Sequence, residues 1–446
     1  MNKLPAHLTT AITTTASLVA IVQFVLQISG MNIIPVISVL AIILLIAVAI
    51  VQIYSAANNA GESPESRKKR KRAIAFIAFD GVLVVFLIVV GLTGTTSKPA
   101  VPVTEDPAYH RSVADEYMKL ERYEPAVLEY QNAVDLEPGE ALNHDKKAQA
   151  LAAQGKYEEA LDENIKAVVL EPEVAQYHYN KGVTLFRLKK YDDAISEMEE
   201  VIRLEPVGPS GYNGCGVVHD GMGEYEKAIA DYDKAIALNP DYAVAYNNRG
   251  NSYRHMGEYE KAIADYDKAI ALNPDFAAAY YNRGSAYDDM GEYEKAIADY
   301  DKAIALNPDF AAAYYNRGNA YADMGEYEKA IANYDKAIAL NPDFAVAYNN
   351  RGNSYRHMGE YEKAIADCDK AIALDPNCAE AYDSRGVAYY NMGEYEKALA
   401  DYDKAIELKP DLAETYHNRG DVYARMGDTS AAEADYAKAR ELGYNP

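Results

Sequence analysis

The sequence lacks tryptophan and holds only three cysteines and eight histidines among its 446 residues. So few cysteines exclude a disulfide framework, and no CxxC, HExxH or similar spacing indicates a metal site. Cys215 stands beside Gly216, which favours a packing role. A bridge between Cys368 and Cys378 stays open, although helix geometry separates these positions by about 9 Å or more and a disulfide tolerates about 7 Å between Cα atoms.

The usual signatures of catalysis are also lacking. The sequence has no glycine-rich phosphate loop, no nucleophile beside an ordered base and no pair of carboxylates outside the repeated pattern described below. It therefore predicts no catalytic residue, no cofactor and no enzyme activity.

Basic residues are scarce relative to acidic ones. The chain has 44 lysines and arginines against 68 aspartates and glutamates, a formal net charge of −24. Residues 1–106 hold 8 of these bases and 5 of the acids, so residues 107–446 hold 36 against 63. Such a surface repels nucleic acid and favours basic partners. Alternatively, the acidic faces only keep a long protein soluble.

Residues 107–446 consist of ten units of equal length that follow one another without a gap. An alanine recurs at the twentieth position of every unit, and in the first nine a proline follows at a constant distance. A fixed period of this kind predicts a stacked array with an extended binding surface. The units begin at residues 107, 141, 175, 209, 243, 277, 311, 345, 379 and 413.

Each unit predicts two helices, which are clearest in the fifth unit. Tyr246, Gly250 and Tyr253 form one helical stripe that we expect to be buried, and Gly257 predicts the end of that helix. A second apolar stripe follows, and an Asn-Pro-Asp sequence ends it. We expect Gly250 and Ala262 to leave room for the backbone of the partner helix, because a larger side chain would overpack at a cost of about 1–3 kcal/mol.

This pattern resembles the tetratricopeptide repeat, whose period is about 34 residues, over all ten units. The resemblance rests on Tyr246-x-x-Arg249-Gly250-x-x-Tyr253 followed by Ala262, Tyr266, Ala269 and Pro274. It implies an all-α, right-handed superhelical solenoid of helix-turn-helix repeats whose first helices line a concave face. Histidine replaces the first aromatic residue in the first three units, at His110, His144 and His178. The last unit has Thr429 and Glu433 in otherwise apolar columns, as a terminal cap needs.

Three apolar runs of equal length precede the array, at 8–29, 33–54 and 73–94. Each is long enough to cross a hydrocarbon core of about 30 Å, so we expect three transmembrane helices. A cleaved signal peptide is the alternative for the first run. Asp80 lies in the third run, where we expect it at the interface, although a charge in a span can also mark a functional site.

The connector 55–72 sets the expected orientation. It ends in six basic residues, 67–72, which place it in the cytoplasm; a nucleic-acid-binding patch is the alternative. The third span then crosses the membrane from the cytoplasm to the outside. The linker 95–106 contains Pro99 and Pro102, which predict an extended spacer. We therefore expect an integral, multi-pass protein of the cytoplasmic membrane with an extracytoplasmic array.

Asparagines recur on the first-helix face opposite the predicted stripe, at the sixth and ninth positions. Asparagine offers the donor and acceptor that can hold an extended peptide backbone. Alternatively, it is a tolerated exposed residue spread by duplication, because 243–265 and 345–367 are identical. The predicted peptide-binding residues are Asn180, Asn248, Asn251, Asn282, Asn316, Asn319, Asn350, Asn353 and Asn418.

Two further columns are expected to be structural or solvated. An arginine precedes the glycine of six units, and we expect it to pair with an acid of a neighbouring unit. The Arg-His pairs at 254–255 and 356–357 are expected to be solvated. The arginines of the first column are Arg249, Arg283, Arg317, Arg351, Arg385 and Arg419.

These patterns predict a membrane-anchored scaffold that binds partner proteins or extended peptides in the concave face of its superhelix, with no nucleic-acid partner. The alternative is an accessory subunit of a membrane enzyme or of an envelope-assembly or export complex. In that case the spans dock the partner and the repeats recruit substrate.

Overall fold

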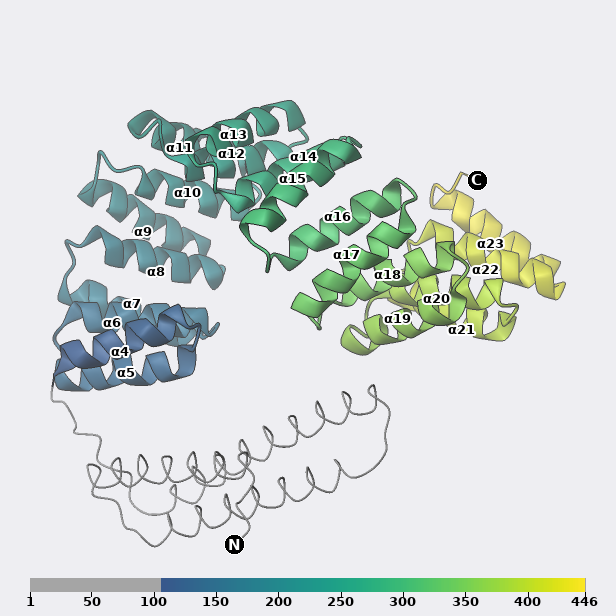
Figure 1. The fold of residues 1–446 in the computed structure, drawn as a ribbon, viewed down its shortest axis with the longest axis horizontal. Coiled ribbons are helices and arrows are strands. Elements are labelled where there is room, and N and C mark those ends of the chain that lie inside the picture. The colour runs from purple at the N-terminus through teal and green to yellow at the C-terminus, as the bar shows by residue number, and fades with distance from the viewer. Residues whose placement is uncertain (1–105, 446) are drawn as a thin grey trace, which may run out of the picture. The chain divides into compact units, whose positions relative to one another are not determined.

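The computed structural model describes residues 106–445, and this part of the chain contains 20 helices and no strand (Figure 1). The all-α repeat solenoid predicted from the sequence is therefore confirmed. Among the described residues, no helix combines the length and apolarity needed to cross a membrane. The predicted spans, the basic residues 67–72, Asp80 and all but the last residue of the linker 95–106 lie outside the described residues.

Each unit supplies a first and a second helix. The first helices are α4 (Pro107–Lys119), α6 (Ala141–Ala153), α8 (Ala175–Arg187), α10 (Ser210–Gly221), α12 (Ala243–His255), α14 (Ala277–Asp289), α16 (Ala311–Asp323), α18 (Ala345–His357), α20 (Ala379–Asn391) and α22 (Ala413–Met426). The second helices are α5 (Tyr123–Leu136), α7 (Tyr157–Leu170), α9 (Tyr191–Leu204), α11 (Tyr225–Leu238), α13 (Tyr259–Leu272), α15 (Tyr293–Leu306), α17 (Tyr327–Leu340), α19 (Tyr361–Leu374), α21 (Tyr395–Leu408) and α23 (Thr429–Glu441).

Two local signals set the helix boundaries. Gly257 has φ +75° and ends α12 as predicted, because glycine adopts this left-handed conformation without steric cost. In the first and third units the same position is held by Glu121 and Lys189, with φ of 55° and 58°. After α13, the Asp275 backbone N–H donates to Asn273 Oδ1 at 3.2 Å, and this Asx turn leads into α14.

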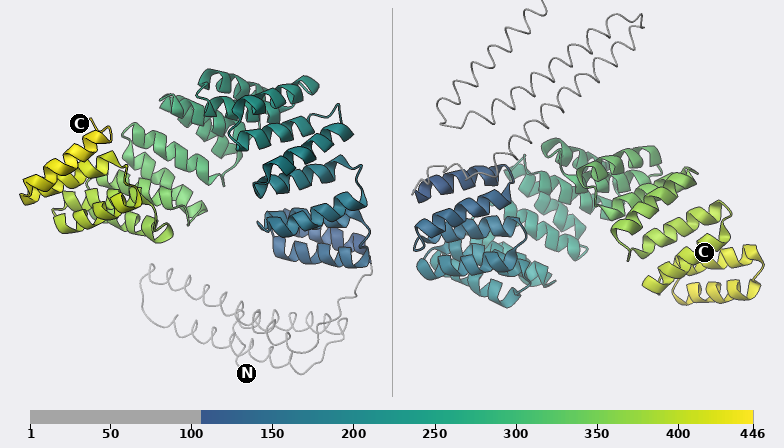
Figure 2. Two further views of the ribbon diagram at one scale, coloured as in Figure 1. Left: turned by 180° about the vertical axis from the view of Figure 1, so that it is seen from behind. Right: turned by 90° about the horizontal axis from the view of Figure 1, so that it is seen from below.

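The first helices lie closer together than the second ones. Each first helix packs against the second helix of its own unit, and from α6 onward also against the second helix of the preceding unit. From α6 onward, successive first helices also contact each other. No two successive second helices pack comparably closely in the described part of the chain. The array therefore narrows on the side of the first helices, which makes that side concave, and Figure 2 shows the same succession of pairs from two other sides. The right-handed sense of the superhelix stays a prediction.

The core differs in one respect from the predicted stripe. Tyr246 and Tyr253 are only half-buried, whereas Ala245 and Ser252 are fully buried. The reason is that a first helix is covered from several sides, so its buried surface is wider than one stripe. A Cβ atom at Gly250 would lie 2.7 Å from the ring of Tyr266, so the nearest neighbour of this glycine is an aromatic ring. At the equivalent Gly284 and Gly352 a Cβ would also meet a backbone carbonyl oxygen of the second helix, at 3.2 and 3.1 Å, as expected.

The second helices bury the same columns of residues from one unit to the next. Ala262, Tyr266 and Ala269 have no exposed surface, and the same three columns are buried in the neighbouring units. In the last unit Thr429 and Glu433 are exposed, as expected of a terminal repeat.

Candidate functional site

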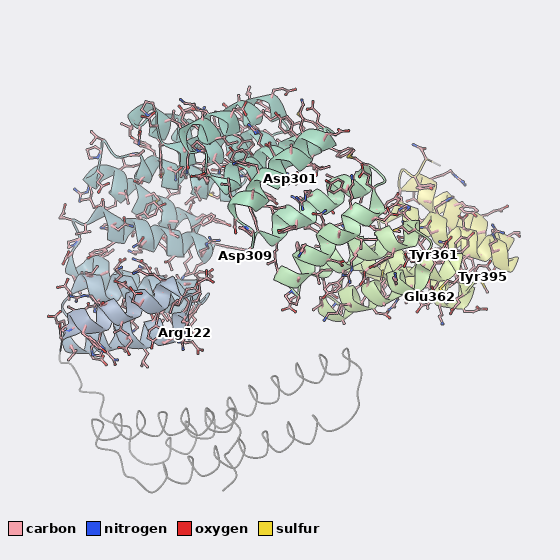
Figure 3. The ribbon with its side chains drawn as sticks, in the orientation of Figure 1. Arg122, Asp301, Asp309, Tyr361, Glu362 and Tyr395 are labelled. Carbon is pink, nitrogen blue, oxygen red and sulfur yellow. The ribbon has the colours of Figure 1, made fainter. Side chains whose placement is uncertain are left out.

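The arginine column ties successive units together. Arg249 donates from Nε and Nη2 to Asp265 of its own unit at 2.7 and 2.6 Å, and from Nη1 to Asp233 of the preceding unit. Arg317 keeps the bond to the preceding unit, to Asp301 on α15 (labelled in Figure 3), but faces an asparagine in its own unit. The expected pairing with a neighbouring unit is therefore present. The full arrangement recurs at Arg283, Arg351, Arg385 and Arg419.

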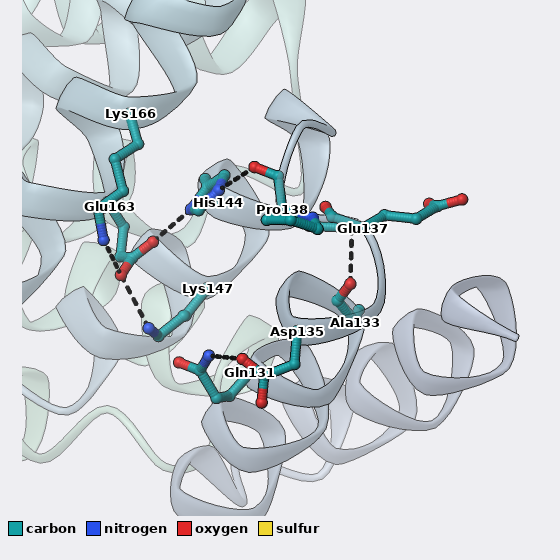
Figure 4. A network of polar contacts seen from close by, with 10 residues as sticks. Gln131, Ala133, Asp135, Glu137, Pro138, His144, Lys147, Glu163 and Lys166 are labelled. Atoms are coloured by element: carbon teal, nitrogen blue, oxygen red, sulfur yellow. Dashed lines mark hydrogen bonds and ion pairs between the residues drawn. The ribbon is translucent and has the colours of Figure 1, made fainter. Parts of the chain in front are cut away.

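In the second and third units a lysine replaces this arginine and acts together with a histidine, whereas the first unit has the histidine alone. His144 Nδ1 lies 2.5 Å from Glu163 Oε2, and Lys147 donates to the other carboxylate oxygen at 2.8 Å (Figure 4). Burial alone would raise the pKa of Glu163, but hydrogen bonds from His144, Lys147 and Lys166 outweigh it and hold the pKa at about 2. His110 and His178 contact the equivalent glutamates at 2.6 and 2.7 Å, so these histidines have a structural role.

The sixth-position asparagines link adjacent units. They are half-buried, and their amide groups donate to the fifth position of the preceding unit. Asn248 reaches Asn213 at 3.2 Å, and Asn350 reaches the hydroxyl of Tyr315 at 2.9 Å. These amides therefore already use one donor to stack the array. The other members with such a bond are Asn180, Asn282 and Asn316.

The ninth-position asparagines differ from one another. Asn251 and Asn319 each accept a hydrogen bond from the buried tyrosine of the second helix, at 2.8 and 2.9 Å. Asn353 has no such tyrosine, because Cys368 occupies that position, and its Oδ1 accepts only from Arg356 Nε at 3.5 Å. The amide of Asn353 is therefore held less firmly than its two counterparts.

Asn353 lines a hollow on the concave side, which we call the α14–α18 hollow. It has a volume of about 510 Å³ and is built from three successive units. The rings of Tyr327 and His357 stack at 4.7 Å on one wall, nearly parallel. The lining includes Asp288, Asn319, Asp323, Tyr327, Asn353 and His357.

The electrostatics of the α14–α18 hollow are set by Asp288. Its Oδ1 is shielded from solvent and has no hydrogen-bond partner among the described residues. Burial, reinforced by the charges of Asp323 and Asp289, raises the pKa of Asp288 from 3.8 to about 6. On the opposite wall, burial and Arg356 lower the pKa of His357, which is therefore neutral near pH 7.

The sequence predicted only part of this site. The structure brings together Asn319, Asn350 and Asn353 of the predicted set, while Asn180 and Asn418 lie in distant units. Asp288 and Asp323 were missed, although an Asp-Asp pair at the end of α14 departs from the Arg-His pairs of the related units. His357 is exposed, as expected, and its ring also stacks on Tyr327.

None of the three cysteines lines the hollow. Cys215, Cys368 and Cys378 are free thiols, so the two candidates for a bridge are not joined. Burial raises the pKa of the Cys368 thiol to about 12, which keeps it protonated. Within residues 106–445, no three histidine, cysteine or acidic side chains are grouped so that they could hold a metal ion.

Several solved structures are similar to parts of the chain. A tetratricopeptide repeat protein from Parabacteroides merdae shares 24% identity, with a TM-score of 0.45, over 53% of this chain and 94% of that one. YrrB, described as a TPR protein with an unusual peptide-binding site, shares 30% identity, with a TM-score of 0.36, over 42% and 96%. MamA from Desulfovibrio magneticus RS-1 shares 25%, with a TM-score of 0.35, over 37% and 94%. No curated protein matches the chain significantly.

Family comparisons agree with the helical pattern. A model described as TPR repeat matches residues 221–254, 250–291, 286–325, 318–359 and 388–427. Models described as tetratricopeptide repeat match residues 146–209, 345–378 and 413–442. Because these matches cover most of the array and the helix pairs repeat at a constant interval, the chain belongs to the tetratricopeptide repeat family.

Proposed function

We propose that this chain is a membrane-anchored scaffold that binds partner proteins, or extended segments of them, along the concave face of its first helices. In this proposal the spans 8–29, 33–54 and 73–94 anchor the chain, and the basic residues 67–72 lie in the cytoplasm. The array then lies outside the cytoplasm. The length of the apolar runs and the position of the basic residues support this topology.

The α14–α18 hollow is the observation that carries the binding function. It presents amides, carboxylates and two stacked rings from three successive units on the concave side. Tetratricopeptide repeats generally serve as protein-interaction modules, and convergent polar groups in a concave site suit recognition by hydrogen bonding. The proposal assigns no catalytic step to the chain, because this fold is typically a non-catalytic scaffold.

The two asparagine columns have different roles in the proposal. The sixth-position residues such as Asn248 and Asn350 hold adjacent units in register through their hydrogen bonds. The ninth-position residues Asn251, Asn319 and Asn353 keep free amide N–H groups, which can donate to the carbonyl groups of a bound backbone. We therefore expect direct contacts mainly from the ninth position.

A selection from a random library of decapeptides tests the binding function. The full-length chain, purified in mild detergent, is the bait, and the affinities of the selected peptides are measured by fluorescence anisotropy. We expect Asn353→Ala to weaken binding about tenfold, because one or two hydrogen bonds to the peptide are lost. Lys336→Ala, on an exposed position of α17, should leave affinity unchanged. A library without binders, or binders indifferent to Asn353, would refute the proposal.

Protease digestion tests the topology and the role of the spans. A tag after Pro446 should be digested in intact cells stripped of outer layers, and protection until lysis would contradict an extracytoplasmic array. Replacing residues 1–94 by one unrelated span should preserve peptide binding if the spans are only an anchor. If that replacement instead breaks a detergent-stable assembly with a membrane enzyme or export complex, the accessory-subunit alternative is favoured.

A further inference from the structure

An internal duplication shows what is particular to the α14–α18 hollow. Residues 243–265 and 345–367 are identical, so α12 and α18 present the same side chains to their neighbours. Any difference between the two places therefore comes from the preceding units and from the residues that follow the identical segments. The surroundings of α12 in the fifth unit can therefore be compared directly with those of α18 in the eighth.

The neighbours of α12 close the equivalent place. Phe186 and Gly221 stand where the hollow has Asp288 and Asp323, and the Phe186 ring packs so closely on Gly221 that a Cβ there would lie 2.4 Å from it. The Ser252 hydroxyl donates to Asp220, whose counterpart beside α18 is an alanine. The α12 copy thus faces the Phe186 ring and a carboxylate that already accepts a hydrogen bond from Ser252. The α18 copy faces the open hollow and the carboxylates of Asp288 and Asp323.

One carboxylate oxygen of the hollow has no hydrogen-bond partner among the described residues. Asp289, next to Asp288, forms an ion pair with Arg254 at 2.6 Å. Arg356 donates to His357 Nε2 at 3.0 Å and to Asn353 at 3.5 Å, so this guanidinium is engaged on the opposite wall. The Oδ1 of Asp288 has no partner among the described residues, and Asp323 lies on the rim.

We propose that the α14–α18 hollow is a subsite for the ammonium or guanidinium group of a lysine or arginine side chain carried by an extended partner segment. The inference rests on the proposed peptide-binding function and specifies which side chain the site selects. Asp288, whose Oδ1 is shielded from solvent, supplies the counter-charge, and Asp323 supplies the charge at the entrance. The Tyr327–His357 pair lines the path of the aliphatic stem, and the neighbouring amide oxygens accept the remaining N–H groups.

The chemistry of the lining favours a cation over the other side-chain classes. An acidic group would meet two carboxylates of its own sign, and an apolar group would leave the Asp288 oxygen unpaired. A charge-assisted hydrogen bond to a carboxylate is stronger than a neutral one. The volume of about 510 Å³ is ample for a long side chain together with part of its backbone.

The test uses decapeptides selected on the full-length chain and variants of them. We expect the selected peptides to carry lysine or arginine at one fixed position. Changing that residue to norleucine should lower affinity about tenfold on the unaltered protein. On Asp288→Asn the same change should alter affinity less than about twofold, and Asp323→Asn should give an intermediate loss.

Matched controls come from the duplicated segment. Asn251→Ala and His255→Ala alter the copy that faces Phe186, so they should leave the lysine preference intact, whereas Asn353→Ala and His357→Ala should reduce it. Circular dichroism checks that each variant is folded. Lysine amide, added free as a competitor, should displace the peptides only at far higher concentration, because it lacks the extended backbone.

The outcomes separate this inference from the function on which it rests. If selected peptides depend on Asn353 but show no basic residue and no sensitivity to Asp288→Asn, the cation subsite is refuted while peptide binding stands. If free lysine amide competes as well as a peptide does, the hollow is an amine site and the partner segment is refuted. If no peptide is selected, both proposals fail.

Discussion

Replacing Asp288 by asparagine should stabilise the array at neutral pH even though it removes the proposed counter-charge. Burial and the neighbouring carboxylates Asp323 and Asp289 raise the pKa of Asp288 to about 6. A raised carboxyl pKa means that the folded chain disfavours the charged form. Above pH 6 the ionised Asp288 therefore destabilises the fold, and a neutral isosteric amide relieves this cost.

The magnitude follows from the size of that shift. A change from 3.8 to about 6 corresponds to about 3 kcal/mol for a fully enclosed group. Asp288 is only partly buried, and solvent screening reduces the expected gain to about 1 kcal/mol. The gain should vanish below about pH 4, where both folded and unfolded chains bind the proton, grow between about pH 4 and 6, and stay constant above.

The assay is urea unfolding of the full chain, followed by circular dichroism at about pH 4 and pH 7. Hydrogen exchange of α14 and α16 should accompany it, because repeat arrays can open in segments. Asp289→Asn is the control: it breaks the ion pair with Arg254 and should give no gain. Equal stability of Asp288→Asn and the unaltered chain at pH 7, or an equal gain at both pH values, would refute the reasoning.

Three further substitutions test the packing of the array. Arg351→Met should cost about 2–3 kcal/mol in urea unfolding and Arg317→Met about 1 kcal/mol less, because the first arginine binds two carboxylates and the second only one. Lys189→Gly should raise stability by about 0.5–1 kcal/mol, measured by thermal unfolding, since this lysine has φ of 58°. Gly386→Ala should destabilise by about 1–3 kcal/mol, because its Cβ would meet a tyrosine ring at 2.7 Å; Gly352→Ala, where the nearest atom is a carbonyl oxygen at 3.1 Å, should cost less.

The sequence predicted the parts of the fold that depend on one unit. The helix pair, the stop at Gly257 and the buried Ala262 all follow from spacing within a single unit. The predicted stripe through Tyr246 and Tyr253 was too narrow, because periodicity describes an isolated helix and these helices are covered by two units. The expected close approach of a backbone is present at Gly284 and Gly352, but the sequence did not predict that a tyrosine ring of the same unit would be the nearest neighbour of Gly250.

The candidate site could be predicted only in outline. The sequence shows the two asparagine columns. Which individual asparagines line an open hollow depends on side chains in the two preceding units. Asp288 lines the hollow at the position where the related place beside α12 has Phe186, and such a difference between single units carries no periodic signal. The bond from Asn350 to Tyr315 likewise joins residues of two different units. Contacts of this kind leave no signal in the spacing of residues within a single unit.

The duplicated segments permit one more prediction, at the first residue where they differ. That residue is Tyr266 in one copy and Cys368 in the other. Tyr266 is fully buried and its hydroxyl donates to Asn251 at 2.8 Å. Cys368 is equally buried but has no hydroxyl, so it leaves Asn353 without that bond. Cys368 therefore affects the α14–α18 hollow indirectly, because it provides no hydroxyl to hold the Asn353 side chain.

Cys368→Tyr should strengthen the array and weaken peptide binding at the same time. Gly352 is retained, so the ring has the same glycine to pack on as in the other units, and its burial should stabilise the chain by about 1–2 kcal/mol in urea unfolding. Its hydroxyl should then hold Asn353, and the affinity of lysine-containing decapeptides should fall several-fold. Tyr266→Cys is the reciprocal control and should cost about 2–3 kcal/mol without affecting those peptides. If Cys368→Tyr instead lowers stability, α18 and α20 pack too closely around the smaller cysteine to accept the ring. In that case the missing tyrosine hydroxyl does not explain why the Asn353 side chain is held less firmly.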